Sequence, residues 1–118
     1  MKKFTKEFGH HYLVDFIDCD SEKIKFVRDV KPVFLKAARR SRATILESFF
    51  HQFEPYGVTG IIMIAESHFS IHTWPEDGFV AFDVLTCGEM SPQRAIEEIK
   101  RGFAAQRVEV KIFPRGFS

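Results

Sequence analysis

The chain has 118 residues, of which 45% are hydrophobic, and its 17 basic side chains nearly balance 16 acidic ones. This length suits one domain with a single core, and the absence of any block of like charge argues against nucleic acid or an anionic membrane surface as a partner. Two cysteines form no disulfide framework, the N-terminal stretch lacks the apolar core of a signal peptide, and no apolar run approaches the roughly 20 residues of a membrane span, so we expect a reduced, cytoplasmic protein.

The first half of the chain contains a strand pattern, a helix pattern and a second strand pattern. Residues 10–18 alternate in the manner of a half-buried strand. Apolar residues then recur at helical spacing, which predicts a helix near 30–41, provided that Pro32 lies in its first turn. Residues 43–53 again have the pattern of a strand.

The second half is predicted to be rich in strands, with one further helix. Residues 57–74 form either two strands or one bent strand, and residues 78–87 form another. Ser91 is placed as a helix N-cap and Pro92 as the first helical residue, where the N–H that proline lacks is not needed. The apolar stripe of this helix comprises Ala95, Ile96, Ile99 and Phe103. The last predicted strand is "QRVEVKIF", residues 106–113.

These elements predict a single α+β domain over residues 1–118, with one mostly antiparallel sheet and two helices on one of its faces. The strand segments "FVAFDVL" and "IIMIA" are apolar on both sides. Because the helices cover only one face, the other face needs a cover. A second copy of the sheet or a substrate pocket is the natural candidate.

The segment "AESHFSIHTWPEDG" (65–78) is dense in polar and aromatic side chains. His68 and His72 are four residues apart, which in a strand places them on one face but about 13 Å from each other. One metal ion cannot be held by both, and no other cluster has the spacing of metal ligands, so we expect no metal site. Ser67 lacks the Gly-x-Ser-x-Gly surroundings of a serine hydrolase.

A serine that follows a carboxylic residue is also able to attack its own backbone. Attack of the Ser67 hydroxyl on the Glu66 carbonyl turns the amide into an ester, and β-elimination then breaks the chain and leads to a pyruvoyl group. The motif "ESHFSIHTWPE", with "GVTG" before it and "FDVLTCGE" after it, resembles the bacterial and archaeal S-adenosylmethionine decarboxylases, which process themselves in this way. The similarity runs from "GHHYLVDFIDCD" to "PRG", which is nearly the whole chain.

The resemblance implies a chain that cuts itself in two and uses one cut end as its cofactor. The products are a β chain of residues 1–66 and an α chain of residues 67–118, whose first residue, Ser67, becomes the pyruvoyl group. A ketone carbonyl that forms a Schiff base with an amino-acid substrate acts as an electron sink, so no pyridoxal phosphate is needed. The residues that match the family's other processing and catalytic groups are His72 (processing base), Cys87 (acid that returns a proton) and Thr59 (in place of a serine that assists processing).

The resemblance also implies a substrate site and an assembly. Phe53 and Trp74 match aromatic positions that contact adenine, and Glu76 matches a carboxylate that binds the ribose hydroxyls. The expected partners are S-adenosylmethionine, decarboxylated for spermidine biosynthesis, and a second processed copy, which gives a homodimer with an α/β/β/α sandwich. Neither nucleic acid nor a membrane is expected as a partner. The role of His68 is open between a structural and an active-site function.

The sequence departs from the family pattern at two positions. Thr59 carries a methyl group that serine lacks, which fixes its χ1 angle and is expected to slow cleavage. Arg42 stands where the family often has a glycine after the helix, so a left-handed helix cap there would be strained or replaced by another conformation. Cys19 is interpreted as structural.

Two alternatives are open beside the favoured interpretation. One is a pyruvoyl-dependent ornithine or arginine decarboxylase on the same scaffold, which would not need the nucleoside contacts of Phe53, Trp74 and Glu76. The other is a processing-incompetent homologue that regulates an active partner chain. The intact Ser67, His72 and Cys87 argue against it.

Overall fold

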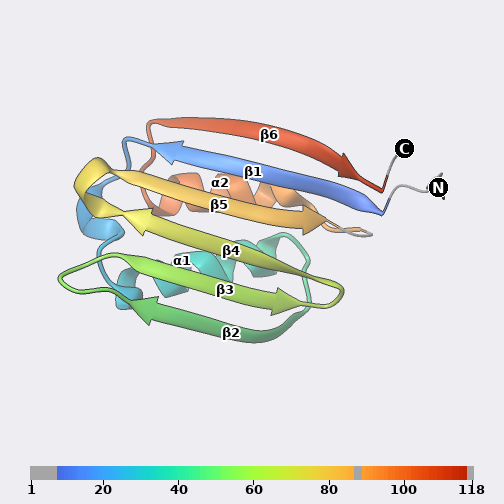
Figure 1. Ribbon diagram of the computed structural model, residues 1–118, viewed down its shortest axis with the longest axis horizontal. Coiled ribbons are helices and arrows are strands. Elements are labelled where there is room, and N and C mark those ends of the chain that lie inside the picture. The colour runs from blue at the N-terminus through green and yellow to red at the C-terminus, as the bar shows by residue number, and fades with distance from the viewer. Residues whose placement is uncertain (1–7, 87–88, 117–118) are drawn as a thin grey trace, which may run out of the picture.

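The structure is a computed structural model that describes residues 8–86 and 89–116, and within them it has one six-stranded sheet with two helices on one face (Figure 1). All strand pairs are antiparallel, in the order β2-β3-β4-β5-β1-β6. The predicted α+β class is confirmed, and residues 57–74 form two strands rather than one. The strands are β1 (Gly9–Ile17), β2 (Ile45–Gln52), β3 (Val58–Ile64), β4 (Ser67–Trp74), β5 (Phe79–Thr86) and β6 (Arg107–Arg115). The helices are α1 (Val27–Arg40), α2 (Pro92–Gly102) and two single 3-10 turns, η1 (Ser21–Lys23) and η2 (Pro75–Asp77).

The core lies between the sheet and the helices and is centred on Phe34 of α1. The centroid of its ring lies 6.1 Å from those of Phe50 and Phe82 and 6.2 Å from that of Phe69. The contacts to Phe50 and Phe82 are edge-to-face, a geometry that adds about 0.5–1.5 kcal/mol beyond the burial of each ring. The three partner rings come from β2, β4 and β5, so one helix side chain ties three strands together.

Helix α1 begins at Val27, three residues before the predicted start, so the prediction that Pro32 occupies the first turn is wrong. The earlier start is possible because the Val27 N–H donates to Oε1 of Gln52 at 2.7 Å, which satisfies one of the N–H groups that a helix start leaves unpaired. Pro32 lies in the second turn, where it cannot donate to the Arg28 carbonyl. A side chain from β2 thus stabilises a helix start that the local sequence did not indicate.

Helix α1 ends in a left-handed residue that is not glycine. The Ala43 N–H donates to the Ala38 carbonyl at 3.3 Å and the Arg42 N–H to the Arg39 carbonyl at 3.1 Å, which is the Schellman pattern. Arg42 occupies the position where this motif favours glycine, with φ of +70°. Of the two expected outcomes, the left-handed cap is kept rather than replaced, and for a residue with a side chain this conformation costs about 1 kcal/mol relative to glycine.

Helix α2 follows its predicted pattern. It begins at Pro92, directly after Ser91, although no side-chain hydrogen bond of Ser91 caps the helix. The predicted stripe faces the core, with Ile96 half-buried and three residues fully buried, Ala95, Ile99 and Phe103. Among the described residues, no helix is both long enough and apolar enough to cross a bilayer.

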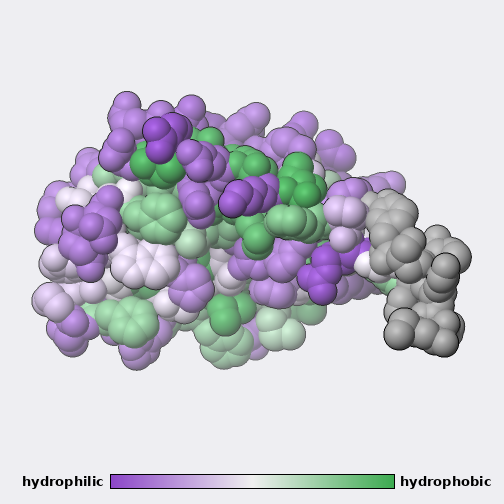
Figure 2. Space-filling view, turned by 45° about the horizontal axis from the view of Figure 1, so that its top comes forward, coloured by the Kyte–Doolittle hydropathy of each residue, from purple (hydrophilic) through white to green (hydrophobic). Residues whose placement is uncertain are grey.

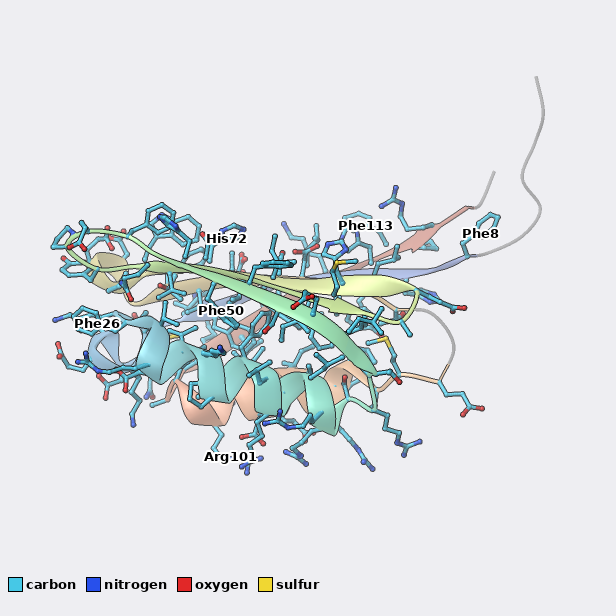
Figure 3. The ribbon with its side chains drawn as sticks, turned by 90° about the horizontal axis from the view of Figure 1, so that it is seen from below. Phe8, Phe26, Phe50, His72, Arg101 and Phe113 are labelled. Atoms are coloured by element: carbon cyan, nitrogen blue, oxygen red, sulfur yellow. The ribbon has the colours of Figure 1, made fainter. Side chains whose placement is uncertain are left out.

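The face of the sheet opposite the helices, here called the outer face, is uncovered in the single chain. Figure 3 shows His72 and Phe113 projecting from the outer face, whereas Phe50 points toward the helices. Exposed apolar patches lie among polar ones on the molecular surface in Figure 2. The large apolar side chains that the outer face exposes by 40% or more are Leu13, Phe49, Ile61, Met63, Trp74 and Phe113.

A buried carboxylate, Glu98, joins the two helices. Its Oε1 accepts a hydrogen bond from Arg40 at 2.9 Å, and Lys36 and Arg101 each have a nitrogen 3.6 Å from one of its oxygens. Burial alone raises the pKa of Glu98, but the Arg40 hydrogen bond and the charges of Arg101 and Lys36 outweigh burial and hold the pKa below its usual value. The ionised carboxylate therefore stabilises the fold at neutral pH, and this contribution is lost as the pH falls through the lowered pKa.

Replacing Glu98 by glutamine is expected to remove this pH-dependent contribution. At neutral pH, Glu98→Gln should lower the free energy of unfolding by about 1 kcal/mol, because the glutamine oxygen still accepts from Arg40 but lacks the negative charge that strengthens this hydrogen bond. On acidification, the variant should lose less stability than the wild type. Thermal unfolding followed by circular dichroism measures both effects, with Glu97→Gln as the control because Glu97 is a less buried carboxylate on the same helix. Equal acid sensitivity of the wild type and Glu98→Gln would contradict the prediction.

Candidate active site

Strand β4 carries the polar segment singled out in the sequence and is hydrogen-bonded on both sides, to β3 and to β5. Its side chains alternate between the two faces of the sheet. Those buried toward the helices are Phe69, Ile71 and Thr73, and those exposed on the outer face are His68, His72 and Trp74. The two histidines share one face, as the sequence predicted.

The Glu66–Ser67 peptide bond lies where a tight turn meets β4. Ile64 of β3 pairs with Ser67, so Ala65 and Glu66 form a two-residue hairpin turn. Glu66 has φ of +74°, in the left-handed region that costs a residue with a side chain roughly 1 kcal/mol. The Ser67 hydroxyl donates to the Leu85 carbonyl of β5 at 2.5 Å. The candidate cleavage site is thus a strained turn at the surface, with its serine held by a hydrogen bond.

Thr59 and His72 form a second candidate pair. They are direct partners across β3 and β4, and Oγ1 of Thr59 lies 3.0 Å from Nδ1 of His72. A hydroxyl is able to donate to or accept from a ring nitrogen, so this hydrogen bond orients the imidazole. The centroid of the His72 ring lies 6.1 Å from that of Trp74. His72 is therefore an oriented imidazole on the open outer face.

An open pocket of about 350 Å³ lies beside this pair. It is formed where the β2–β3 connection meets the end of β4 and the turn η2. Gly78 has φ of +60° at the end of η2, a conformation that lets the chain reverse directly into β5. The lining residues that carry chemistry are Phe53, Tyr56, Thr59, His72, Trp74 and Glu76. The three residues predicted for substrate binding therefore lie in one pocket, next to the predicted processing base.

The tertiary structure also decides among the aromatic residues near "FFHQF". Phe49 is exposed on the outer face, Phe50 packs on Phe34 in the core, and Phe53 lines the pocket. Tyr56 lines the same pocket, but it was not predicted from the sequence. The available signal was that Tyr56 follows Phe53 in the same connection.

Ser67 and His72 do not meet within one chain. Five residues of β4 separate them, which is about 16 Å along an extended strand. Their side chains also belong to opposite faces of the sheet, because the separation is an odd number of residues. One chain therefore holds the cleavage site at one end of β4 and the base with its pocket at the other end. Cys87 lies outside the described residues, directly after Thr86, where β5 ends.

A polar cluster occupies the outer face between these two ends. Asp83 of β5 accepts a hydrogen bond from the Ser70 hydroxyl and lies 2.7 Å from Nε2 of His11 on β1. Nε2 of His68 lies 3.9 Å from the same carboxylate, and Arg115 lies 3.3 Å from Nδ1 of His11. His68 thus belongs to this cluster. Neither His11 nor Asp83 was predicted from the sequence. The available signal was Asp83 itself, the single acidic residue in the apolar run "FVAFDVL".

Two further kinds of reactive site, a reactive cysteine and a metal site, are not found in the described part of the chain. Cys19 is buried, and burial, together with the charge of Asp18, raises the pKa of its thiol to about 11, so it stays protonated at neutral pH. No group of three or more His, Cys, Asp or Glu residues in that part could hold a metal ion.

Solved structures with the same arrangement of sheet and helices are decarboxylases. The crystal structure of the adenosylmethionine decarboxylase from Aquifex aeolicus matches 97% of this chain and 95% of its own chain, with a TM-score of 0.86 and 35% identity. A Trypanosoma brucei AdoMetDC monomer matches 88% of this chain and 45% of its own, with a TM-score of 0.68 and 15% identity, which shows the fold alone. The similarity to the Aquifex aeolicus enzyme, which extends over nearly the whole chain, places this protein in the class of decarboxylases.

The relatives in sequence are equally specific. An S-adenosylmethionine decarboxylase proenzyme from Thermotoga petrophila is 45% identical over 112 residues, covering 94% of this chain and 86% of the relative. One from Pyrococcus horikoshii is 43% identical over 109 residues, covering 92% and 78%. The family model described as S-adenosylmethionine decarboxylase matches residues 10–116. The chain belongs to the S-adenosylmethionine decarboxylase family, and the resemblance in its motifs is confirmed.

Proposed function

We propose that the chain is a proenzyme that cuts itself between Glu66 and Ser67 and then decarboxylates S-adenosylmethionine, the product being the aminopropyl donor for spermidine biosynthesis. The observation that carries the proposal is the strained two-residue turn that presents this bond. Strain in the intact turn is relieved when the bond breaks, so the turn favours cleavage. The relatives, which are named as decarboxylase proenzymes, support the same conclusion.

Cleavage begins with transfer of the chain from nitrogen to oxygen. The Ser67 Oγ adds to the Glu66 carbonyl carbon, the C–N bond breaks, and the hydroxyl proton passes to the new amine, which leaves an ester. A base then removes the Cα proton of residue 67, the Cβ–Oγ bond breaks, and its electrons leave on the Glu66 carboxylate. Water converts the resulting dehydroalanine into a pyruvoyl group with loss of ammonia. The β chain then ends at residue 66 and the α chain begins at residue 67.

The base assigned to the elimination step is His72, which Thr59 orients, but it is too far from Ser67 of its own chain. A second copy packed on the outer face resolves the separation along the strand. The two copies are related by a two-fold axis that lies between their sheets and runs perpendicular to the strands. This rotation makes β4 of the second copy run opposite to β4 of the first, so His72 of one copy lies over the Ser67 end of the other. This homodimer is an α/β/β/α sandwich, and it buries the exposed apolar side chains of the outer face.

The pocket suits a nucleoside. The faces of Phe53 and Trp74 provide aromatic surface for stacking on adenine, and the Glu76 carboxylate is able to accept two hydrogen bonds from a ribose diol. The pocket volume of about 350 Å³ lies within the usual range of about 300–1,000 Å³ for small-molecule sites. A small basic amino acid such as ornithine or arginine would use neither the two aromatic faces nor the diol acceptor.

The residues around the cleavage site fit a pyruvoyl cofactor. When formed at residue 67, this group supplies a carbonyl that accepts the electrons released as the substrate loses its carboxylate. The hydrogen bond from Ser67 to the Leu85 carbonyl places residue 67 beside the end of β5, from which the chain continues to Cys87. Cys87 is the residue assigned to return a proton to the substrate carbon.

Self-cleavage is the first expected outcome. The purified chain should separate into fragments of residues 1–66 and 67–118 on a denaturing gel, and mass spectrometry should find a ketone in place of the amine at residue 67. Ser67→Ala should stay whole. Thr59→Val should cleave roughly tenfold more slowly, because His72 loses the hydroxyl that orients it, and Thr59→Ser should not. A wild-type chain that stays intact after prolonged incubation would exclude the proposed function.

Complementation between two inactive variants tests the shared site. Ser67→Ala and His72→Ala, each expressed alone, should remain uncleaved. In a mixed dimer, the His72→Ala chain should be cut, because its intact Ser67 meets His72 of the Ser67→Ala chain. Co-expression with two different affinity tags and a denaturing gel identifies which chain is cut. If no His72→Ala chain is cut in purified mixed dimers, the cross-copy assignment of the base is wrong.

The substrate is tested with processed enzyme. Release of carbon dioxide is measured from S-adenosylmethionine, ornithine and arginine offered separately, and only the first should react. Trp74→Ala should weaken S-adenosylmethionine binding roughly 10- to 100-fold, because a stacked base partner is worth on the order of 1–3 kcal/mol. Activity on ornithine or arginine alone would replace the nucleoside interpretation, and a cleaved chain inactive on all three would contradict the proposed substrate.

A further inference from the structure

The presence of an arginine at position 42 is not explained by the structure of the end of helix α1. The Schellman hydrogen bonds place it in a left-handed conformation, with φ of +70°, that glycine adopts without strain. Its side chain is exposed, and none of the ion pairs in the described part of the chain involves its guanidinium. An arginine here is thus unfavourable for the helix end and makes no compensating ion pair within that part. A role outside helix stability would account for it.

The position of Arg42 places it beside the candidate cleavage site. It lines a pocket of about 200 Å³ together with Ile64 and Ala65, the residues that lead into the hairpin turn, and with Glu89. The Ala65 N–H donates to the Thr44 carbonyl at 3.0 Å, which fastens the turn to the segment that follows Arg42. A cation therefore lies at the wall of a small pocket that is also lined by Ala65, the residue before Glu66.

Cleavage changes the charge at this point of the structure. Before cleavage, Glu66 contributes a neutral backbone carbonyl, whereas elimination releases that group as a carboxylate. The new charge appears on the residue that already carries the Glu66 side-chain carboxylate, and a further carboxylate, Glu89, lines the pocket beside the turn. Like charges at short range oppose ionisation of the leaving group unless a cation is close. An arginine is well suited because its guanidinium binds a carboxylate through two parallel hydrogen bonds.

We propose that Arg42 pairs with the backbone carboxylate of Glu66 as it leaves Ser67, and then holds this end of the β chain in place. This inference rests on the proposed self-cleavage and deepens it. The pairing acts on the elimination step, in which the Cβ–Oγ bond breaks and its electrons pass to the carboxylate. It leaves the preceding formation of the ester unaffected, because no carboxylate exists at that stage.

Arg42→Gly separates this role from a structural one, because it is expected to change stability and cleavage in opposite directions. In an uncleavable Ser67→Ala background, Arg42→Gly should raise Tm by roughly 2–5 °C, since glycine relieves the left-handed strain. In the cleavable chain, the same substitution should slow appearance of the fragments about tenfold. The uncut chain should then accumulate as the ester, which hydroxylamine cuts at residue 66 without forming a ketone.

Three further variants complete the experiment, followed by denaturing gel and mass spectrometry. Arg42→Lys should retain most of the cleavage rate, Arg42→Gln should be as slow as Arg42→Gly, and Arg39→Gln should cleave like the wild type, because it removes a nearby exposed charge at the end of the same helix. Wild-type rates in Arg42→Gly and Arg42→Gln would overturn the inference, as would slow cleavage without accumulated ester. If the wild type itself does not cleave, the proposed function fails instead.

Discussion

The pairing of β4 with a strand on each of its edges is the constraint on which the rest of the structure depends. A strand paired on both sides cannot shift by one residue without turning every side chain to the other face of the sheet. Phe69 is thereby held against Phe34 in the core, and His72 is held on the outer face beside Thr59. The same register that builds the core therefore separates the two halves of the candidate site.

Two of the four described non-glycine residues with positive φ, Glu66 and Arg42, lie in neighbouring connections, the β3–β4 turn and the α1–β2 loop. The Ala65 N–H bonds to the Thr44 carbonyl, so the hairpin turn and the end of α1 support each other. Left-handed residues persist only where the surrounding structure holds them, and here the hairpin pairing and the Schellman hydrogen bonds do so. Stability from the Phe34 cluster and from Glu98 offsets the strain. The proposed cleavage draws on strain that the rest of the domain sustains.

The proposed homodimer would both complete the candidate site and cover the exposed outer face of the sheet. In the single chain, the outer face exposes apolar side chains such as Ile61 and Met63, and the same face carries His72. Burying that face against a second copy completes the packing, and it also brings each His72 toward the partner's cleavage site. The cluster around Asp83 lies between the two ends of β4, so it would lie within the interface. Assembly and processing are then coupled by geometry.

Local patterns in the sequence determined the element order, the fold class and the motif that led to the family, because alternation, helical spacing and Pro or Ser at a helix start act over a few residues. They did not determine where α1 begins, since its first N–H is satisfied by Gln52, 25 residues away. They did not show that Phe53 rather than Phe49 or Phe50 lines the pocket, because that choice depends on which face and which end of β2 each residue occupies. Only the tertiary structure showed that Ser67 and His72, five residues apart in one motif, lie on opposite faces of one strand. The physical reason is that a strand extends about 3.3 Å per residue and alternates its side chains, so closeness in sequence becomes separation in space.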